Sequence, residues 1–170
     1  SVIDELPAGR KPIKTEHFYE TKRLVLNGKL KEEIRKGRQI YVVYPLIEES
    51  EKLDYKNLSD GFESITRAFP EYHVSMVHGK LFPYEKDFEM QRFVKGETQI
   101  MVATTVIEVG VNVPNASVMV IESAERFGLS QLHQLRGRVG RGADQSYCYL
   151  MTDVKLSKDT RIRIDTLCET

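Results

Sequence analysis

Short apolar runs rich in β-branched residues recur along the chain. The clearest run covers residues 39–44 (QIYVVY) and stops at Pro45, which is the pattern of a buried parallel strand. Similar runs predict strands at residues 13–19, 74–77, 100–103, 117–121 and 147–151. Amphipathic stretches between them predict helices at residues 21–36, 58–69, 84–94, 131–141 and 159–167. Alternation of strands and helices predicts an α/β fold, a parallel sheet of about six strands with helices on both faces.

Polar segments follow several of the predicted strands. They are residues 45–50, the His78-Gly79-Lys80 run, Thr104-Thr105 and the segment that leads into Gln131. In parallel sheets the functional residues gather on loops at the carboxyl ends of the strands. We therefore expect these segments to meet at one edge of the sheet.

The composition is that of a globular domain. The chain has 170 residues, 41% apolar and 29% charged, and its 25 Lys+Arg balance 25 Asp+Glu. Neutrality argues against indiscriminate binding of polyanions but leaves room for a local basic patch. No apolar run approaches the ~20 residues that span a bilayer, and the first residues do not resemble a signal peptide. We expect no membrane association and a cytoplasmic location.

The two cysteines, Cys148 and Cys168, lack the clustering of a metal site or a disulfide framework, and the four histidines are scattered. Buried thiols in a reducing compartment are the preferred interpretation. The sequence therefore predicts no metal site.

Arginines concentrate in one part of this neutral chain. Residues 126–142 contain four arginines and no carboxylate. Leu129, Leu132 and Leu135 give the predicted helix an inward stripe, and Arg138 and Arg141, three residues apart, are expected to leave one face together.

Three interpretations of this stretch compete. One is a flexible RGG-type tail, and the periodicity of the flanking leucines argues against it. Another is a solvated helix end whose arginines favour the C-terminal dipole. However, Gly137 and Gly140 would each lower the stability of a helix by about 1 kcal/mol. A solvated surface without a function does not explain this loss. Planar guanidinium groups suit phosphate oxygens, so an anionic partner is the preferred interpretation.

Several motifs resemble those of the helicases built from two RecA-like domains. Residues 134–141 (Q-x-x-G-R-x-G-R) resemble motif VI, residues 103–114 resemble motif V, and YPLIEES at 44–50 resembles motif IV. The strand at 74–77 with the following His-Gly is also similar to a family feature. The amino-acid sequences of residues 106–122 and 124–142 are most similar to those of the RecG family of bacterial branch-migrating DNA helicases. The resemblance covers nearly the whole chain, and the combination of motifs is highly specific.

The resemblance implies a RecA-like fold and the second of two motor domains, between which ATP binds. By motif position, Arg138 and Arg141 match the catalytic arginines that reach across to the γ-phosphate. Gln134, Gly110 and Asn112 match residues near the nucleotide. At position 112 the family usually has an acid that contacts the ribose, and Asn112 offers a carbonyl without the charge.

The resemblance also implies contacts with DNA. Thr104 matches a motif V threonine that hydrogen-bonds a nucleic-acid phosphate, with Thr105 beside it, and Gly79 and Lys80 resemble a further backbone-contacting loop. Hydroxyl groups at a strand end suit that task. Without the family match, Thr104 and Thr105 would be read as β-branched residues ending a buried strand, and Lys80 as a solvated side chain.

Two expected motifs are missing from this sequence. It contains neither a GxxxxGK[ST] phosphate loop nor a DExH-type run. ATP with Mg²⁺ is therefore expected to bind mainly on a first motor domain, and the chain alone is expected to be inactive. The predicted organisation is an extended lead-in at residues 1–12, the motor domain at 13–156, and at 157–170 the start of a truncated helical hairpin.

The sequence thus predicts the second motor domain of a RecG-like, ATP-dependent DNA helicase that remodels forks and junctions in recombination and repair. The expected partners are branched DNA and the first RecA-like domain of the same protein, which is expected to be monomeric. One alternative is the same domain of a transcription–repair coupling translocase. The other is a non-catalytic nucleic-acid-binding module of the same fold.

Overall fold

The computed structural model describes residues 11–46, 51–104, 113–142 and 144–170. Its elements in chain order are β1 (Lys14–Tyr19), the short 3-10 helix η2 (Glu20–Lys22), α1 (Arg23–Arg35), β2 (Gln39–Val43), α2 (Glu51–Ala68), β3 (Val74–Val77), α3 (Pro83–Val94), β4 (Ile100–Ala103), β5 (Ala116–Ile121), η3 (Ala124–Arg126), α4 (Leu129–Arg136), β6 (Tyr147–Thr152) and α5 (Lys158–Glu169). All six predicted strands form.

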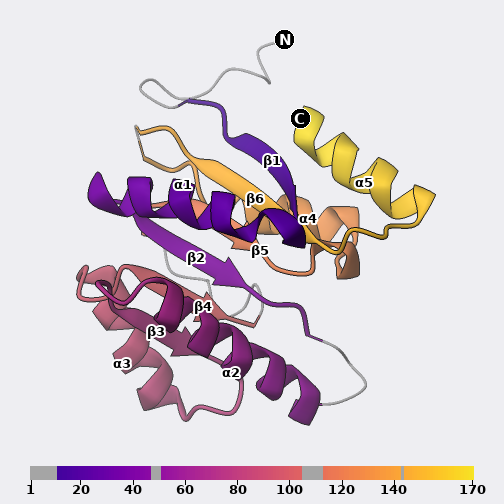
Figure 1. Cartoon of the computed structure of the whole chain (residues 1–170). Coiled ribbons are helices and arrows are strands. Elements are labelled where there is room, and N and C mark those ends of the chain that lie inside the picture. Colours follow the sequence, from indigo (N-terminus) through magenta and orange to yellow (C-terminus); the bar gives the residue numbers. More distant parts are fainter. Residues whose placement is uncertain (1–10, 47–50, 105–112, 143) are drawn as a thin grey trace.

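The strands make one parallel sheet in the order β1-β6-β5-β2-β4-β3 (Figure 1). β2 lies between β4 and β5, so Val42 is paired with Val102 on one side and with Val120 on the other. Every residue of β2 is buried, as expected for a central strand covered on both faces. The predicted parallel sheet is confirmed.

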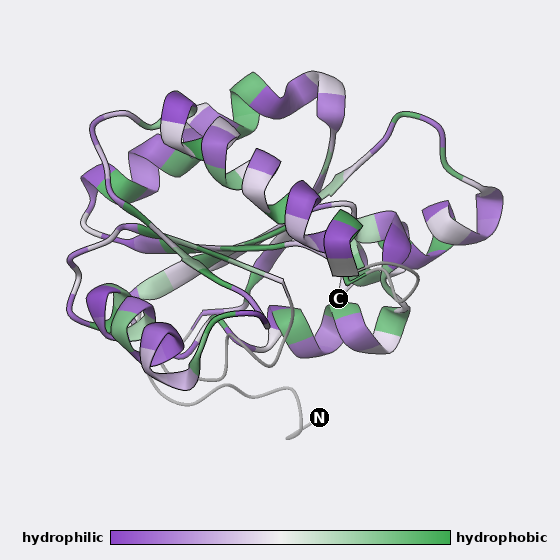
Figure 2. Cartoon of the chain, turned by 90° about the horizontal axis from the view of Figure 1, so that it is seen from below, coloured by the Kyte–Doolittle hydropathy of each residue, from purple (hydrophilic) through white to green (hydrophobic). Residues whose placement is uncertain are grey.

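Helices cover both faces of the sheet. Ile40 and Val42 pack with residues of α1 and α2, whereas Tyr41 and Val43 pack with residues of α3, α4 and α5. This alternation follows from the two-residue period of a strand. Figure 2 shows apolar colouring along the strands and mixed colouring on the helices, which turn one side to the sheet and the other to water.

Helix α2 begins seven residues before its predicted start, at Glu51 instead of residue 58. Its first two turns carry few buried side chains: Asp54 and Leu58 face inward, while Leu53 and Tyr55 are 45% and 41% exposed. The first half of α2 is therefore too polar to show the apolar stripe from which a helix is predicted. The added turns bring Tyr55 to the carboxyl edge of the sheet.

Helix α4 ends at Arg136, so the predicted helix to residue 141 is wrong in its second half. Gly137 is the C-cap, and the Arg138 amide donates to the Leu135 carbonyl over 3.0 Å. Gly140 has φ +84°, and a Cβ there would lie 2.8 Å from Cγ1 of Ile13. The glycines end the helix and allow a close backbone approach. Arg138 and Arg141 therefore lie on a loop and do not share a helical face.

The last helix packs on the same core as α4. Ser157 caps α5 by accepting a 3.2 Å hydrogen bond from the Thr160 amide, and Ile164 and Leu167 are fully buried beside Leu135. The assignment of residues 157–170 to a helical hairpin remains a prediction.

Candidate functional site

Three predicted DNA-contacting residues meet in one cleft at the carboxyl edge of the sheet. Gly79 and Lys80 follow β3, and Thr104 follows β4. Together they line a cavity of about 260 Å³, whose other walls are Leu46, Asp54, Tyr55 and His78. We call it the strand-end cleft. The expected convergence is confirmed for the described ends of β2, β3 and β4, whereas the segment that leads into Gln131 does not line this cleft.

The position of Lys80 in this cleft is set by two aromatic residues. Nδ1 of His78 accepts a 3.1 Å hydrogen bond from the Lys80 amide, and the Lys80 ammonium lies 5.4 Å from the centre of the Tyr55 ring. Tyr55 and His78 are themselves in edge contact at 4.9 Å. The aromatic face attracts the ammonium electrostatically and keeps it at the cleft. Sequence reasoning missed Tyr55 because the start of α2 was placed too late.

The predicted catalytic arginines lie at the opposite, amino-terminal edge of the sheet, on residues 137–142, which we call the arginine loop. Gly140 packs on Ile13, just before β1. The backbone of Gly142 approaches Pro114, which precedes β5. After the loop, Asp144 pairs at 2.6 Å with Arg38, which precedes β2.

The guanidinium groups of Arg138 and Arg141 have neither a hydrogen bond nor an ion pair within the described residues. Arg138 is half-buried and Arg141 is exposed. Burial raises the pKa of Tyr41 to about 12, while the charges of Arg138 and Arg141 act in the other direction. Both charges therefore reach the phenol of Tyr41, on the face of the sheet that α3, α4 and α5 cover. Two unpaired cations there are suited to an external anion.

A neighbouring arginine has a different environment. Arg136, the last residue of α4, donates to the Leu167 carbonyl at 3.0 Å, to Oγ1 of Thr170 at 2.8 Å and to Oγ1 of Thr15 at 3.3 Å. These bonds tie α4 to α5 and β1. Arg136 therefore serves the structure of the domain, and the motif spacing alone does not reveal this division of roles.

The structure leaves other predicted site residues apart or outside its description. Gln134 is exposed on α4, and no described side chain bonds to it. Thr105, Gly110 and Asn112 lie outside the described residues, so their predicted contacts with DNA and nucleotide stay predictions.

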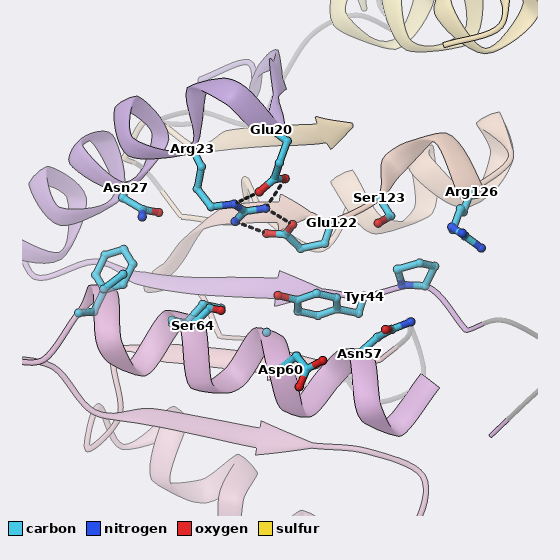
Figure 3. A pocket seen from close by; sticks show the side chains of 15 residues that line it. Glu20, Arg23, Asn27, Tyr44, Asn57, Asp60, Ser64, Glu122, Ser123 and Arg126 are labelled. Atoms are coloured by element: carbon cyan, nitrogen blue, oxygen red, sulfur yellow. Dashed lines mark hydrogen bonds and ion pairs between the residues drawn. The ribbon is translucent and has the colours of Figure 1, made fainter. Parts of the chain in front are cut away.

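A larger cleft lies between α1 and α2, over the carboxyl ends of β2 and β5 (Figure 3). Its volume is about 390 Å³, and we call it the α1–α2 cleft. Arg23 crosses its floor and makes four hydrogen bonds of 2.5–2.9 Å to Glu20 and Glu122. Burial lowers the pKa of Arg23, but the bonds to both carboxylates outweigh it and raise the pKa above its ordinary value. Residues so far apart in sequence gave no signal of this contact.

The described part of the chain was also compared with the requirements of a metal site, a reactive cysteine and a membrane-spanning helix. No three His, Cys, Asp or Glu side chains there gather in a way that could hold a metal ion. Cys148 and Cys168 are free, and burial raises the pKa of Cys148 to about 12, which keeps its thiol protonated and unreactive. None of the described helices has the length and apolarity to cross a membrane.

Residues 21–143 match the family model of the helicase conserved C-terminal domain. The chain is 51% identical over 168 residues to the ATP-dependent DNA helicase RecG of Synechocystis sp., which covers 98% of this chain and 20% of that protein. It is 52% identical over 174 residues to RecG of Bacillus subtilis, with 100% and 25% covered. The chain thus spans a quarter or less of the length of these relatives.

Solved structures give the same picture. A RecG bound to a three-way DNA junction superposes with a TM-score of 0.79 and 39% identity, over 97% of this chain and 21% of that one. The C-terminal domain of the DEAD-box protein Dbp5 superposes with a TM-score of 0.59 and 17% identity, over 94% of this chain and 85% of that one. The second likeness concerns the fold alone.

Proposed function

Because the chain belongs to the helicase conserved C-terminal domain family, we propose that it is the second motor domain of a RecG-type ATP-dependent DNA helicase. Its α/β fold is RecA-like, as the motifs predicted. The whole protein would remodel branched DNA in recombination and repair, as a cytoplasmic monomer. A RecG relative bound to a three-way DNA junction supports this choice of substrate.

The arginine loop carries the proposal. Arg138 and Arg141 have no partner among the described residues, and Gly140 holds the loop in a conformation that L side chains rarely adopt. Guanidinium groups placed without a carboxylate are suited to the charge on a transferring phosphoryl group. In the assembled motor they would face the γ-phosphate of ATP bound on the first RecA-like domain.

The first domain would supply the main nucleotide site, since this chain has neither a phosphate loop nor a DExH-type run. Bound ATP with Mg²⁺ brings the phosphoryl group that is transferred. This chain contributes the two arginines, which neutralise charge as that group leaves. Gln134, Gly110 and Asn112 would complete the nucleotide side of the interface. Residues 13–156 would form the motor domain proper.

The strand-end cleft would grip DNA. The exposed ammonium of Lys80 is available to phosphate oxygens, and Thr104, which is 4% exposed, would offer its hydroxyl from the wall of the cleft. At Gly79 the backbone is open to close approach, because a Cβ there would meet nothing within 4 Å. Such contacts position the duplex or strand without reading sequence. Thr105 would extend the same contact.

A steady-state ATPase assay of the full-length protein with saturating branched DNA tests the catalytic role. Arg138→Ala and Arg141→Ala should each lower turnover by roughly 10³–10⁵-fold, the usual contribution of an arginine finger. The melting temperature and the affinity for DNA without nucleotide should change little, because neither side chain has a partner within the described residues.

Arg67→Ala is the matched control. Arg67 is an exposed arginine at the end of α2, also without a partner within the described residues, but remote from motif VI. Its removal should leave turnover unchanged. If both loop variants keep rates within a few-fold of the control, the proposed role of the arginine loop is wrong.

A further inference from the structure

The two edge strands of the sheet differ in what protects them. β1 and β3 stand at the two ends of the strand order, so each has one open edge. β1 carries Lys14 and Glu16, and charged side chains on an edge strand discourage another strand from pairing with it. β3 (VSMV) has no charged residue. The open edge of β3 is therefore the one that is suited to accept a further strand.

The backbone of β3 turns hydrogen-bonding groups to its open edge at alternate residues. The Ile100 amide of β4 donates to the His73 carbonyl at 3.4 Å, so residues 73, 75 and 77 direct their amides and carbonyls toward β4. Val74 and Met76 consequently direct theirs to the open edge. Within the described ranges, no backbone hydrogen bond outside the sheet involves Val74 or Met76. These groups are available to a strand that is not part of the domain.

A groove of about 550 Å³ runs over this open edge, and we call it the β3-edge groove. Phe62 of α2 and Met76, which packs on the α2 face of the sheet, form one wall. The other wall lies in α3 and directly before it, and consists of Leu81, Tyr84, Glu85, Phe88 and Glu89. α2 and α3 cover opposite faces of the sheet (Figure 1). A groove lined from both faces has to pass over the rim of the sheet, where β3 is the last strand.

The α3 wall of the groove exposes aromatic side chains. Tyr84 and Phe88 are 72% and 64% exposed. Phe82, which is 62% exposed, stacks on Tyr84 with the ring centres 5.8 Å apart. Exposed apolar groups gathered at one place mark an interaction surface. Aromatic faces also attract cations.

The polar residues of the same wall are acidic. Glu89 pairs with Arg92 at 3.0 Å. Glu85 accepts a hydrogen bond from the Phe82 amide at 2.9 Å and has no cation partner among the described side chains. Two carboxylates and one guanidinium leave one negative charge at the groove. A lysine from a partner suits this wall, because its apolar stem covers an aromatic ring while its ammonium reaches Glu85.

We propose that the β3-edge groove is a docking site for another protein, which adds an extended segment to β3 as a further strand. Successive side chains of that strand point to opposite faces of the sheet. Apolar side chains would therefore face Phe62 and Met76, and lysine side chains between them would face Tyr84 and Glu85. The β3-edge groove and the strand-end cleft have no lining residue in common, so the inference does not rest on the proposed DNA contact.

Fluorescence anisotropy of the full-length protein with a fluorescein-labelled peptide of alternating valine and lysine tests the site. Phe88→Ala should weaken binding several-fold, because it removes apolar surface from the groove. Glu85→Gln should weaken binding by at most about fivefold, the limit for an exposed ion pair, and should reduce its dependence on salt. Glutamine keeps an acceptor for the Phe82 amide, so α3 retains its cap. Leu24→Ala, which removes an 85% exposed leucine from α1, should leave binding unchanged.

Methylation of the peptide's own backbone amides tests the strand pairing. Successive amides of a strand point to opposite sides, so either the valine amides or the lysine amides face β3. N-methylation of the set that faces β3 removes its donors and should lower the affinity by about tenfold or more, while N-methylation of the other set should have little effect. A loss in the valine series means that the added strand is antiparallel to β3, and a loss in the lysine series means that it is parallel.

Three results would overturn the proposal. Equal affinities of the two methylated peptides would mean that no strand is added to β3. Absence of binding by the unmodified peptide would mean that the groove is closed in the full-length protein. Dimerisation in analytical ultracentrifugation that Phe88→Ala abolishes would identify a second copy of the chain as the occupant. DNA-stimulated ATP turnover of Phe88→Ala should equal that of the unsubstituted protein, so these results leave the proposed function untouched.

Discussion

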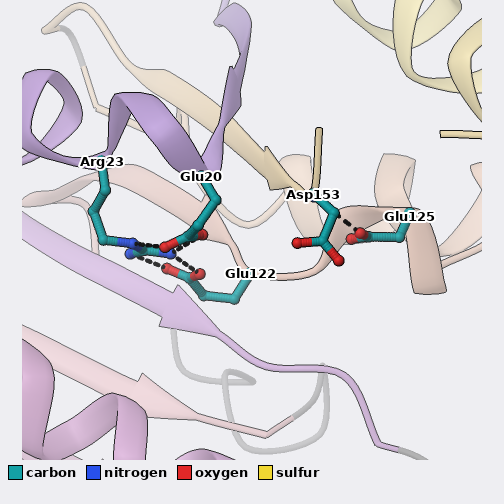
Figure 4. A network of polar contacts seen from close by, with 5 residues as sticks. All are labelled: Glu20, Arg23, Glu122, Glu125 and Asp153. Carbon is teal, nitrogen blue, oxygen red and sulfur yellow. Dashed lines mark hydrogen bonds and ion pairs between the residues drawn. The ribbon is translucent and has the colours of Figure 1, made fainter. Parts of the chain in front are cut away.

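Arg23 and the arginine loop place the same chemical group in opposite surroundings. The guanidinium of Arg23 is held by Glu20 and Glu122, in the network drawn in Figure 4. Arg138 and Arg141 have no such partners within the described residues. Where the domain uses arginine for its own structure, it supplies acceptors for the donors. In the arginine loop it supplies none, and at that place the anion is expected from outside.

The surroundings of other arginines follow the same division. Arg38 pairs with Asp144 at 2.6 Å, and Arg136 bonds to acceptors on α5, on Thr170 directly after it and on β1. Asp144 is only three residues beyond Arg141, yet it faces Arg38. An acid close in sequence therefore does not neutralise the arginine loop, and the difference between the two groups is a property of the fold.

The largest expected effect comes from replacing each arginine by lysine. At positions 138 and 141, lysine should restore little of the turnover that alanine lowers by roughly 10³–10⁵-fold. The reason is that the point charge of an ammonium cannot form the two parallel hydrogen bonds of a guanidinium group. At position 23, lysine should leave ATP turnover per folded molecule nearly unchanged. The measurement is steady-state ATPase of the full-length protein. Full activity of Arg138→Lys and Arg141→Lys would mean that the arginine loop needs only a positive charge. The planar shape of the guanidinium group would then not be required for turnover.

A second expected effect concerns the free energy of unfolding, which should depend on Arg23 and not on the arginine loop. Arg23→Ala leaves the carboxylate of Glu122, only 6% exposed, without its cation. Breaking a buried pair costs about 3–5 kcal/mol. Since Arg23 itself is 31% exposed, we expect a smaller loss, roughly 2 kcal/mol, in the free energy of unfolding measured by urea denaturation.

The controls for this loss lie on the same helix and in the partner residue. Arg35→Ala breaks an exposed pair with Glu32 and should cost at most about 1 kcal/mol. Adding Glu122→Gln to Arg23→Ala should recover part of the stability, because the unpaired charge is removed. An equal cost for Arg23→Ala and Arg35→Ala would show that the buried network is no more stabilising than a surface pair.

The glycine that shapes the arginine loop offers a third way to separate the regions. Gly140→Ala must adopt φ +84° and press on Ile13, so it should destabilise the domain by about 1–2 kcal/mol. It should also lower turnover in the full-length protein by displacing Arg138 and Arg141. Gly28→Ala is the matched change: Gly28 is exposed in α1, a Cβ there meets nothing within 4 Å, and alanine should stabilise by about 0.5–1 kcal/mol. Equal stability of the two variants in urea denaturation would contradict this account of the loop.

How far the sequence predicts this molecule depends on the range of the interaction. The strands were predictable because an apolar run such as that of β2 is buried on both faces whatever its neighbours are. The end of α4 was not, because Gly137 and Gly140 were read as costs inside a helix and not as its stop. The early start of α2 was not predicted because its first turns have no apolar stripe.

The candidate sites divide in the same way. Gly79, Lys80 and Thr104 could be placed together because the carboxyl ends of parallel strands share an edge. The contact of Arg23 with Glu122 joins residues 99 positions apart and depends on the packing of α1 beside β5. No local pattern encodes such a contact, and the α1–α2 cleft above it was equally hidden.

The smallest expected effect is a difference in pH dependence between the two regions. The hydrogen bond from Arg23 lowers the pKa of Glu20 below its ordinary value of 4.5, against the opposing effect of burial. A depressed carboxyl pKa contributes stability that is present above the unfolded value and is lost as the pH falls through the folded value. Glu20 is half exposed, so the contribution is that of a surface pair, about 0.5 kcal/mol. Urea denaturation should therefore find Glu20→Gln less stable than the unsubstituted chain at neutral pH, and the gap should close as the pH falls below 4.5. Arg141→Gln, which removes a cation with no carboxylate beside it, should show a small difference that does not change over the same range. A gap that closes for both variants would place a carboxylate near the arginine loop and remove the contrast on which its catalytic role depends.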